Sequence, residues 1–90
     1  MRIVVRPPSV VSLHKLVGEQ LARGGLYLPK DLQQAQFAAV DVVIECPQSG
    51  ERFELGCEVL QGFPGTATAL NVKPAGLANL DALMAHAMKL

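Results

Sequence analysis

Two arginines near the N-terminus have a spacing that could serve nucleotide binding. Arg2 and Arg6 enclose three apolar residues. Guanidinium groups stack on planar bases and hold phosphates through paired hydrogen bonds. The same segment is β-branched at its centre and stops at two prolines, so it predicts a short strand. A strand places Arg2 and Arg6 on one face with Val4 between them, and a solvated strand face is the simpler interpretation of this spacing.

The other reactive side chains form no recognisable motif. His14 and His86 have no cysteine or carboxylate at a metal-ligand spacing. Cys46 and Cys57 fall on the apolar sides of predicted strands, which favours buried small side chains over reactive thiols. Three serines occupy cap or turn positions without a nucleophile elbow: Ser9, Ser12 and Ser49. The sequence therefore predicts no catalytic site, no metal site and no cofactor.

Length and composition indicate the size, core and charge of the domain that holds these residues. Ninety residues form one domain with a modest core, built mainly from aliphatic side chains because only four residues are aromatic. Eight basic and eight acidic residues leave no net charge to attract nucleic acid or an anionic membrane. No apolar run reaches about 18 residues, and the N-terminus is too short in apolar residues for a secretory signal. We expect residues 1–90 to be one soluble, cytoplasmic domain cut from a longer protein.

The hydrophobic period predicts a mainly β fold. Apolar residues follow Ser9 at helical spacing, which predicts a short helix with Ser9 as its cap. The clearest signal is a hairpin around the turn 47–50, with Cys46 opposite Glu51, and with Cys57 opposite Val40 and too far from Cys46 to form a disulfide. We predict that the inward residues are Val40, Val42, Ile44, Phe53, Leu55, Cys57, Val59 and Leu70.

Two more elements complete the expected architecture. A turn at 62–65 precedes a strand at 66–72. A terminal helix then places Leu77, Leu80 and Met84 on the sheet. Together these elements predict a small antiparallel β-barrel with a short inserted helix and a C-terminal helix.

The segment 20–28, Gln-Leu-Ala-Arg-Gly-Gly-Leu-Tyr-Leu, resembles the signature of the PilZ domain family. In that signature Asp or Asn, then Ser, precedes Gly and an apolar–aromatic–apolar strand. The later hairpin, the strand 65–70 and the closing helix are similar to the rest of a PilZ domain. The helix before the signature is similar to a variant group common in gliding delta-proteobacteria. The resemblance covers most of the chain, although its motif is short, and it implies a PilZ-like β-barrel.

PilZ domains are bacterial receptors for cyclic di-GMP, so the resemblance implies a ligand site. The positions that it assigns are Arg2, Arg6, Gln20, Ala22, Arg23 and Gly25. The family pattern is degenerate here, because Gln20 replaces Asp or Asn, Ala22 replaces Ser and only Gly25 matches. Each lost contact to a charged ligand costs on the order of 1.5–3 kcal/mol, so two losses weaken binding by roughly a hundredfold or more. We also expect Gly25 to adopt a shape that a Cβ would strain, with Gly25→Val costing on the order of 1–3 kcal/mol.

Three functions follow from these observations. We expect a non-catalytic regulatory module that has lost cyclic di-GMP binding and contacts another protein, or other domains of its parent chain, through a patch centred on Tyr27. The alternative is a working cyclic di-GMP receptor that uses Arg2, Arg6 and Arg23. A third possibility is a small nucleic-acid-binding barrel, suggested by the single tripeptide Arg23-Gly24-Gly25. No membrane insertion is expected in any of the three.

Overall fold

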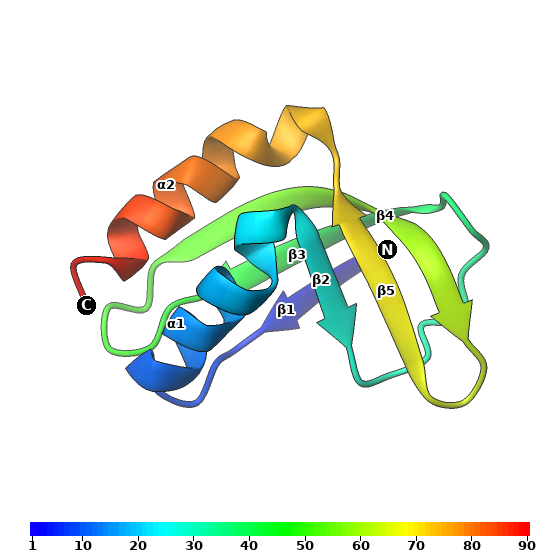
Figure 1. The fold of residues 1–90 in the computed structure, drawn as a ribbon, viewed down its shortest axis with the longest axis horizontal. Helices are drawn as coiled ribbons and strands as arrows, with labels where there is room; N and C mark the ends of the chain where they lie inside the picture. Colours follow the sequence, from blue (N-terminus) through cyan, green and yellow to red (C-terminus); the bar gives the residue numbers. More distant parts are fainter.

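The computed structural model describes residues 1–90 and contains one five-stranded sheet with two α-helices (Figure 1). Ser9 caps the first helix as predicted, because its side chain accepts a hydrogen bond from the N–H of Ser12. Neither helix has the length and apolar sequence needed to cross a bilayer. The elements in chain order are β1 (Arg2–Val5), α1 (Val10–Glu19), the 3-10 turn η1 (Leu21–Arg23), β2 (Gly25–Leu28), β3 (Ala39–Glu45), β4 (Arg52–Phe63), β5 (Ala67–Val72), the 3-10 turn η2 (Pro74–Gly76) and α2 (Leu77–Ala87).

The sheet has the strand order β1-β3-β4-β5-β2. Three of its strand pairs, β3–β4, β4–β5 and β5–β2, are antiparallel, but β1 runs parallel to β3, with Arg2 opposite Asp41. The prediction of a purely antiparallel barrel is therefore wrong, and the sheet is not closed, because β1 and β2 remain as two unpaired edges. Parallel pairing needs a long connection, which the segment from α1 to the start of β3 supplies. Residue alternation within a strand does not reveal strand direction.

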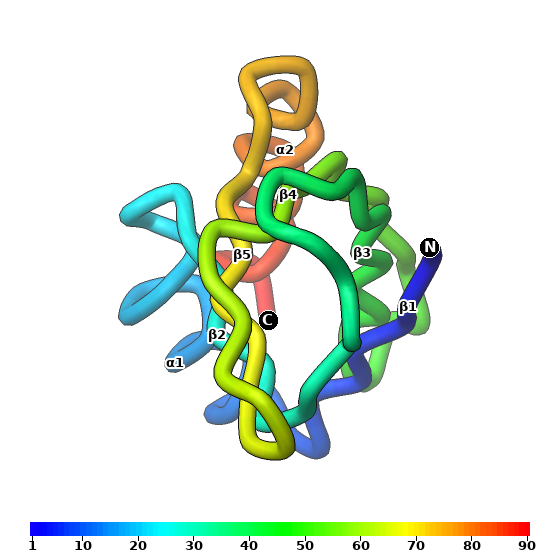
Figure 2. Tube along the Cα trace, turned by 90° about the vertical axis from the view of Figure 1, so that its right-hand side faces the viewer, coloured from blue at the N-terminus to red at the C-terminus, as the bar shows by residue number.

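The long strand β4 joins the two halves of the sheet. It pairs with β3 along its first part and with β5 along its last part, with a bulge between Val59 and Gln61. A bulge bends a strand and increases its twist, and in Figure 2 the β1-β3 side and the β5-β2 side lie on opposite sides of the interior. The turn predicted at 62–65 is displaced, because Gly62 and Phe63 still pair with β5 and the turn spans residues 64–66.

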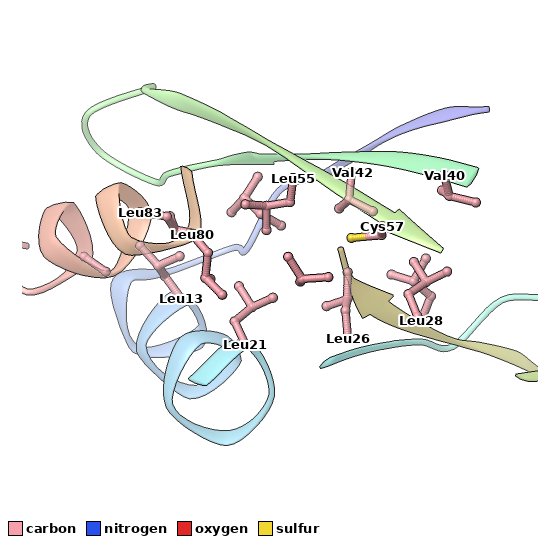
Figure 3. Close-up of a cluster of buried hydrophobic side chains, with 14 of the residues drawn as sticks. Leu13, Leu21, Leu26, Leu28, Val40, Val42, Leu55, Cys57, Leu80 and Leu83 are labelled. Carbon is pink, nitrogen blue, oxygen red and sulfur yellow. The ribbon is translucent and has the colours of Figure 1, made fainter. Parts of the chain in front are cut away.

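The hairpin prediction is confirmed by the core. Val40 lies opposite Cys57, and the N–H of Cys46 donates to the carbonyl of Glu51. Of the eight residues predicted to face inward, only Phe53 is not fully buried, and it packs against the core. The core cluster also includes leucines of both helices, and Figure 3 shows Leu13 of α1 and Leu80 of α2 beside Leu55 of the sheet.

Two side chains depart from the predicted burial. Leu77 is 47 % exposed instead of lying on the sheet. Gly76 makes the contact there, since a Cβ on Gly76 would lie 3.1 Å from the backbone nitrogen of Gly56. Val43 is on the outer face, as its alternation predicts, but it is 1 % exposed because β1 places Val4 beside it.

Candidate functional site

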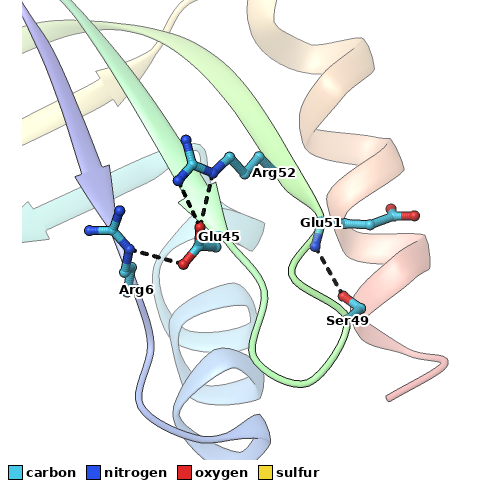
Figure 4. Close-up of polar contacts among 5 residues, drawn as sticks. All are labelled: Arg6, Glu45, Ser49, Glu51 and Arg52. Carbon is cyan, nitrogen blue, oxygen red and sulfur yellow. Dashed lines mark hydrogen bonds and ion pairs between the residues drawn. The ribbon is translucent and has the colours of Figure 1, made fainter.

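Arg2 and Arg6 lie on the outer face of β1, where carboxylates of the neighbouring strands bind them. Nε of Arg6 donates to Glu45 at 2.9 Å, and Arg52 donates to the second oxygen of the same carboxylate at 2.9 Å (Figure 4). Arg2 lies 3.7 Å from Glu54. The hydrogen bond from Arg52, and after it the one from Arg6, holds the pKa of Glu45 below its usual value. This exposed, ion-paired surface matches the simpler interpretation, a solvated strand face.

The segment that resembles the PilZ signature forms the turn into β2. The side-chain oxygen of Gln20 accepts the N–H of Tyr27 at 2.7 Å, and its carbonyl accepts the N–H of Gly25 at 3.3 Å. Gly24, not Gly25, has a positive φ of 77°. A Cβ on Gly25 would lie 3.6 Å from the Leu70 carbonyl, an ordinary contact. The prediction that Gly25 needs a shape without a Cβ is therefore wrong, because the unusual conformation is one residue earlier.

The structure does not assemble the site that the resemblance implies. Arg2 and Arg6 lie at the β1 edge, whereas the turn of Gln20 leads into β2 at the opposite edge, with three strands between them in the sheet (Figure 1). Ala22 and Arg23 are exposed, and Arg23 forms no ion pair. The candidate ligand residues are thus two separate groups.

Tyr27 lies on the outer face of the sheet beside a second aromatic ring. The ring centroids of Tyr27 and Phe63 are 6.4 Å apart with a tilt of 53°, and these side chains are 51 % and 39 % exposed. Ala67 and Ala69 of β5, the strand between them, belong to the same face. Asp31 fixes the adjacent β4–β5 turn by accepting the N–H of Gly65, which lowers the pKa of Asp31. We call Tyr27, Phe63, Ala67 and Ala69 the aromatic face.

A small open pocket lies between the two helices. It has a volume of about 270 Å³ and is mainly apolar, and its lining residues are His14, Val17, Gly18, Met84, Ala87 and Met88. Nε2 of His14 lies 2.7 Å from the carbonyl oxygen of Ala87, so this histidine ties α1 to the end of α2. His14 therefore has a structural partner that its sequence neighbours did not reveal.

Three polar side chains meet where the β3–β4 turn reaches the end of α2. Nε2 of His86 lies 2.9 Å from Oγ of Ser49, and Nδ1 of His86 lies 3.6 Å from a carboxylate oxygen of Glu51. The His86 ring also packs against Phe53, with centroids 5.5 Å apart. Figure 4 shows Ser49 and Glu51 in the turn beside the helix. Sequence reasoning missed this group, because His86 is 37 residues from Ser49 and only the fold brings them together.

The two cysteines are buried and free, as the sequence predicted. Burial raises the pKa of the Cys57 thiol to about 11, and it also raises the pKa of Cys46. A thiol with a raised pKa is protonated near neutral pH and is a poor nucleophile or metal ligand. Both cysteines therefore act as small apolar side chains of the core.

Comparison with known proteins adds no relative to this description. No protein-family model matches the chain, and no curated protein sequence is significantly similar to it. The resemblance to PilZ domains depends on the segment 20–28 and on the order of the elements.

Proposed function

We propose that this chain is a protein-interaction module that binds its partner through the aromatic face. The observation that carries the proposal is the tilted pair of Tyr27 and Phe63, two half-exposed rings in contact above a strand of small side chains. Tyrosine and phenylalanine are enriched in the buried centres of protein interfaces, where they bring a large area at a low entropic cost. The partner is another protein or another domain of the parent chain.

The ion pairs of β1 favour this function over cyclic di-GMP binding. A nucleotide phosphate would have to compete with Glu45 for Arg6 and with Glu54 for Arg2. Gln20 is also engaged, since its side chain holds the N–H of Tyr27. A site built from these residues would lose existing contacts before it gained a ligand. The proposal is therefore a PilZ-like module whose working surface differs from the family's ligand site.

Photo-crosslinking tests the aromatic face directly. A benzophenone amino acid replaces Tyr27 in the full chain, and the protein is irradiated in an extract of its own cells. We expect one discrete adduct, which Phe63→Ala weakens because it removes half of the ring pair. The matched control carries the crosslinker at Val11, an apolar position on α1 that is even more exposed than Tyr27. Equal labelling from positions 11 and 27, or no adduct at all, would contradict the proposal.

Calorimetry with cyclic di-GMP tests the alternative. We expect no binding at micromolar concentration. A dissociation constant below about 10 μM that disappears in Arg6→Ala would instead support a working receptor. Lys15→Ala is the matched control, because Lys15 is an exposed cation on α1, outside both groups of candidate residues.

A further inference from the structure

We propose that Ser49 is a nucleophile that His86 activates and Glu51 orients, and that it takes an acyl group from activated esters such as aryl esters. In space, the imidazole of His86 lies between the hydroxyl of Ser49 and the carboxylate of Glu51, which is the arrangement of acyl-transfer sites. Such sites are recognised by geometry and role, not by the positions of the residues in the sequence. The decisive distances are 2.9 Å from Ser49 Oγ to His86 Nε2 and 3.6 Å from His86 Nδ1 to Glu51. This site lies apart from the aromatic face and does not depend on the proposed function.

The side chain of His86 makes one hydrogen bond, to Ser49, and the carboxylate of Glu51 lies 3.6 Å from Nδ1, beyond hydrogen-bond distance, where it acts on the ring by its charge. A carboxylate beside Nδ1 favours the tautomer that carries its proton on Nδ1. Nε2 then presents a lone pair to the hydroxyl of Ser49, as a general base requires. Phe53 packs on the ring and leaves the side chain of His86 only 19 % exposed, whereas Ser49 is open to solvent. The base is held in place and the nucleophile is accessible.

The reaction is a simple acyl transfer. Oγ of Ser49 bonds to the carbonyl carbon of the ester while its proton moves to Nε2 of His86. The bond from that carbon to the aryl oxygen then breaks, and the phenolate leaves with the electron pair. His86 lies in the last turn of α2, a favourable place for the positive charge that it acquires. His86 first releases the proton that it took from Ser49 to solvent. It then takes a proton from the attacking water and returns it to Oγ of Ser49 as the bond from that oxygen to the acyl carbon breaks, which releases the carboxylic acid and restores Ser49.

The surroundings limit the substrate class. The backbone N–H of Gln48, next to Ser49 in the chain, makes no hydrogen bond within the protein, whereas the N–H of Ser49 donates to the carbonyl of Pro47 and is engaged. A solvent-exposed turn supplies little further stabilisation. Aryl esters suit such a site, because their leaving groups depart without protonation, and we expect slow turnover.

The test uses p-nitrophenyl acetate and the full chain. Release of p-nitrophenolate gives the rate, and mass spectrometry of peptides locates the acetyl group. The variants are Ser49→Ala, His86→Gln and Glu51→Gln. Matched controls are Ser12→Ala, which alters a serine of α1, and His14→Gln, which alters the other histidine. Thermal melting of each variant separates a loss of the nucleophile from a loss of the fold.

We expect acetyl-Ser49 in the wild type and none on Ser12. His86→Gln should lower the rate of acetylation by about 10²-fold or more, the range of general-base catalysis, and Glu51→Gln by a smaller factor. A histidine alone also attacks this ester, so Ser49→Ala is the deciding variant. Phenolate release from Ser49→Ala at the wild-type rate, or equal acetylation of Ser49 in His86→Gln, would overturn the proposal and leave the three side chains as a tether between the turn and α2.

Discussion

The side-chain oxygen of Gln20 accepts the backbone N–H of Tyr27 at 2.7 Å, along the edge of β2. The carbonyl of Gln20 accepts the N–H of Gly25, two residues earlier in the same strand. β2 pairs with β5 on one side only, so Gln20 supplies at its free edge the acceptors that another strand would provide. Exposed strand edges favour association with other chains. Gln20 therefore has a structural role here.

Replacing Gln20 tests this role. We expect Gln20→Ala to lower the free energy of unfolding by about 0.5–1.5 kcal/mol, the net value of one hydrogen bond. The freed edge should also increase self-association at high protein concentration. Urea unfolding and sedimentation measure the two effects. Ala22→Ser, an exposed substitution in the same turn, should change neither; an equal loss in both variants would argue against an edge-capping role.

The two neighbouring glycines should respond differently to alanine. Gly24 has a φ of 77°, which strains any residue with a Cβ, so Gly24→Ala should cost about 1 kcal/mol or more. Gly25 has room for a Cβ, with only an ordinary contact at 3.6 Å, and Gly25→Ala should change stability by less than about 0.5 kcal/mol. Urea midpoints of the two variants give the comparison. The reverse order of stabilities would show that the turn adopts a different backbone.

The sequence predicts the local features of this fold better than its long-range ones. The hairpin register of Val40 and Cys57 follows from strict alternation and a four-residue turn, both of which are local. The parallel pairing of β1 with β3 could not be predicted, because Arg2 and Asp41 are paired only through the path of the intervening chain. Phe63 looked like a turn residue beside Gly62 and Pro64, yet pairing with β5 extends β4 through it.

In the candidate sites, too, features set by the local sequence were predicted, and contacts set by the overall fold were not. Tyr27 was predicted as the centre of a surface patch, and its side chain is half exposed. Its contact with Phe63 was not predicted, because a bulge in β4 decides which side of the strand Phe63 occupies. The group of Ser49, Glu51 and His86 has no local signal, since it depends on where α2 ends relative to the β3–β4 turn.

Acid should remove the contribution of the Glu45 ion pairs to stability. Its pKa is lowered in the folded protein, chiefly by the hydrogen bond from Arg52. A carboxyl with a lowered folded pKa contributes stability above its unfolded pKa and loses that contribution as the pH falls through the folded value. We therefore expect Glu45→Gln to be less stable than the wild type at pH 7 and to approach it as the pH is lowered into the acid range. Thermal melts across this range measure the difference, with Glu58→Gln as the control, because Glu58 forms no ion pair. A constant difference between wild type and Glu45→Gln at all pH values would contradict an ionic contribution.

The core cysteines should be protected from thiol reagents in the folded state. Burial raises the pKa of Cys57 to about 11, so at pH 8 its thiolate fraction is roughly a hundredfold below that of an exposed cysteine. Both thiols are also shielded sterically, with at most 1 % exposure. We expect slow reaction with a disulfide reagent in buffer and rapid reaction of both thiols in urea.

Cys46 should react before Cys57, because it adjoins the β3–β4 turn, whereas Cys57 lies within β4 between β3 and β5. The single variants Cys46→Ala and Cys57→Ala assign the two rates. If Cys57 reacted in buffer as fast as in urea, the two halves of the sheet would have to separate readily, and the core described here would not be the stable one.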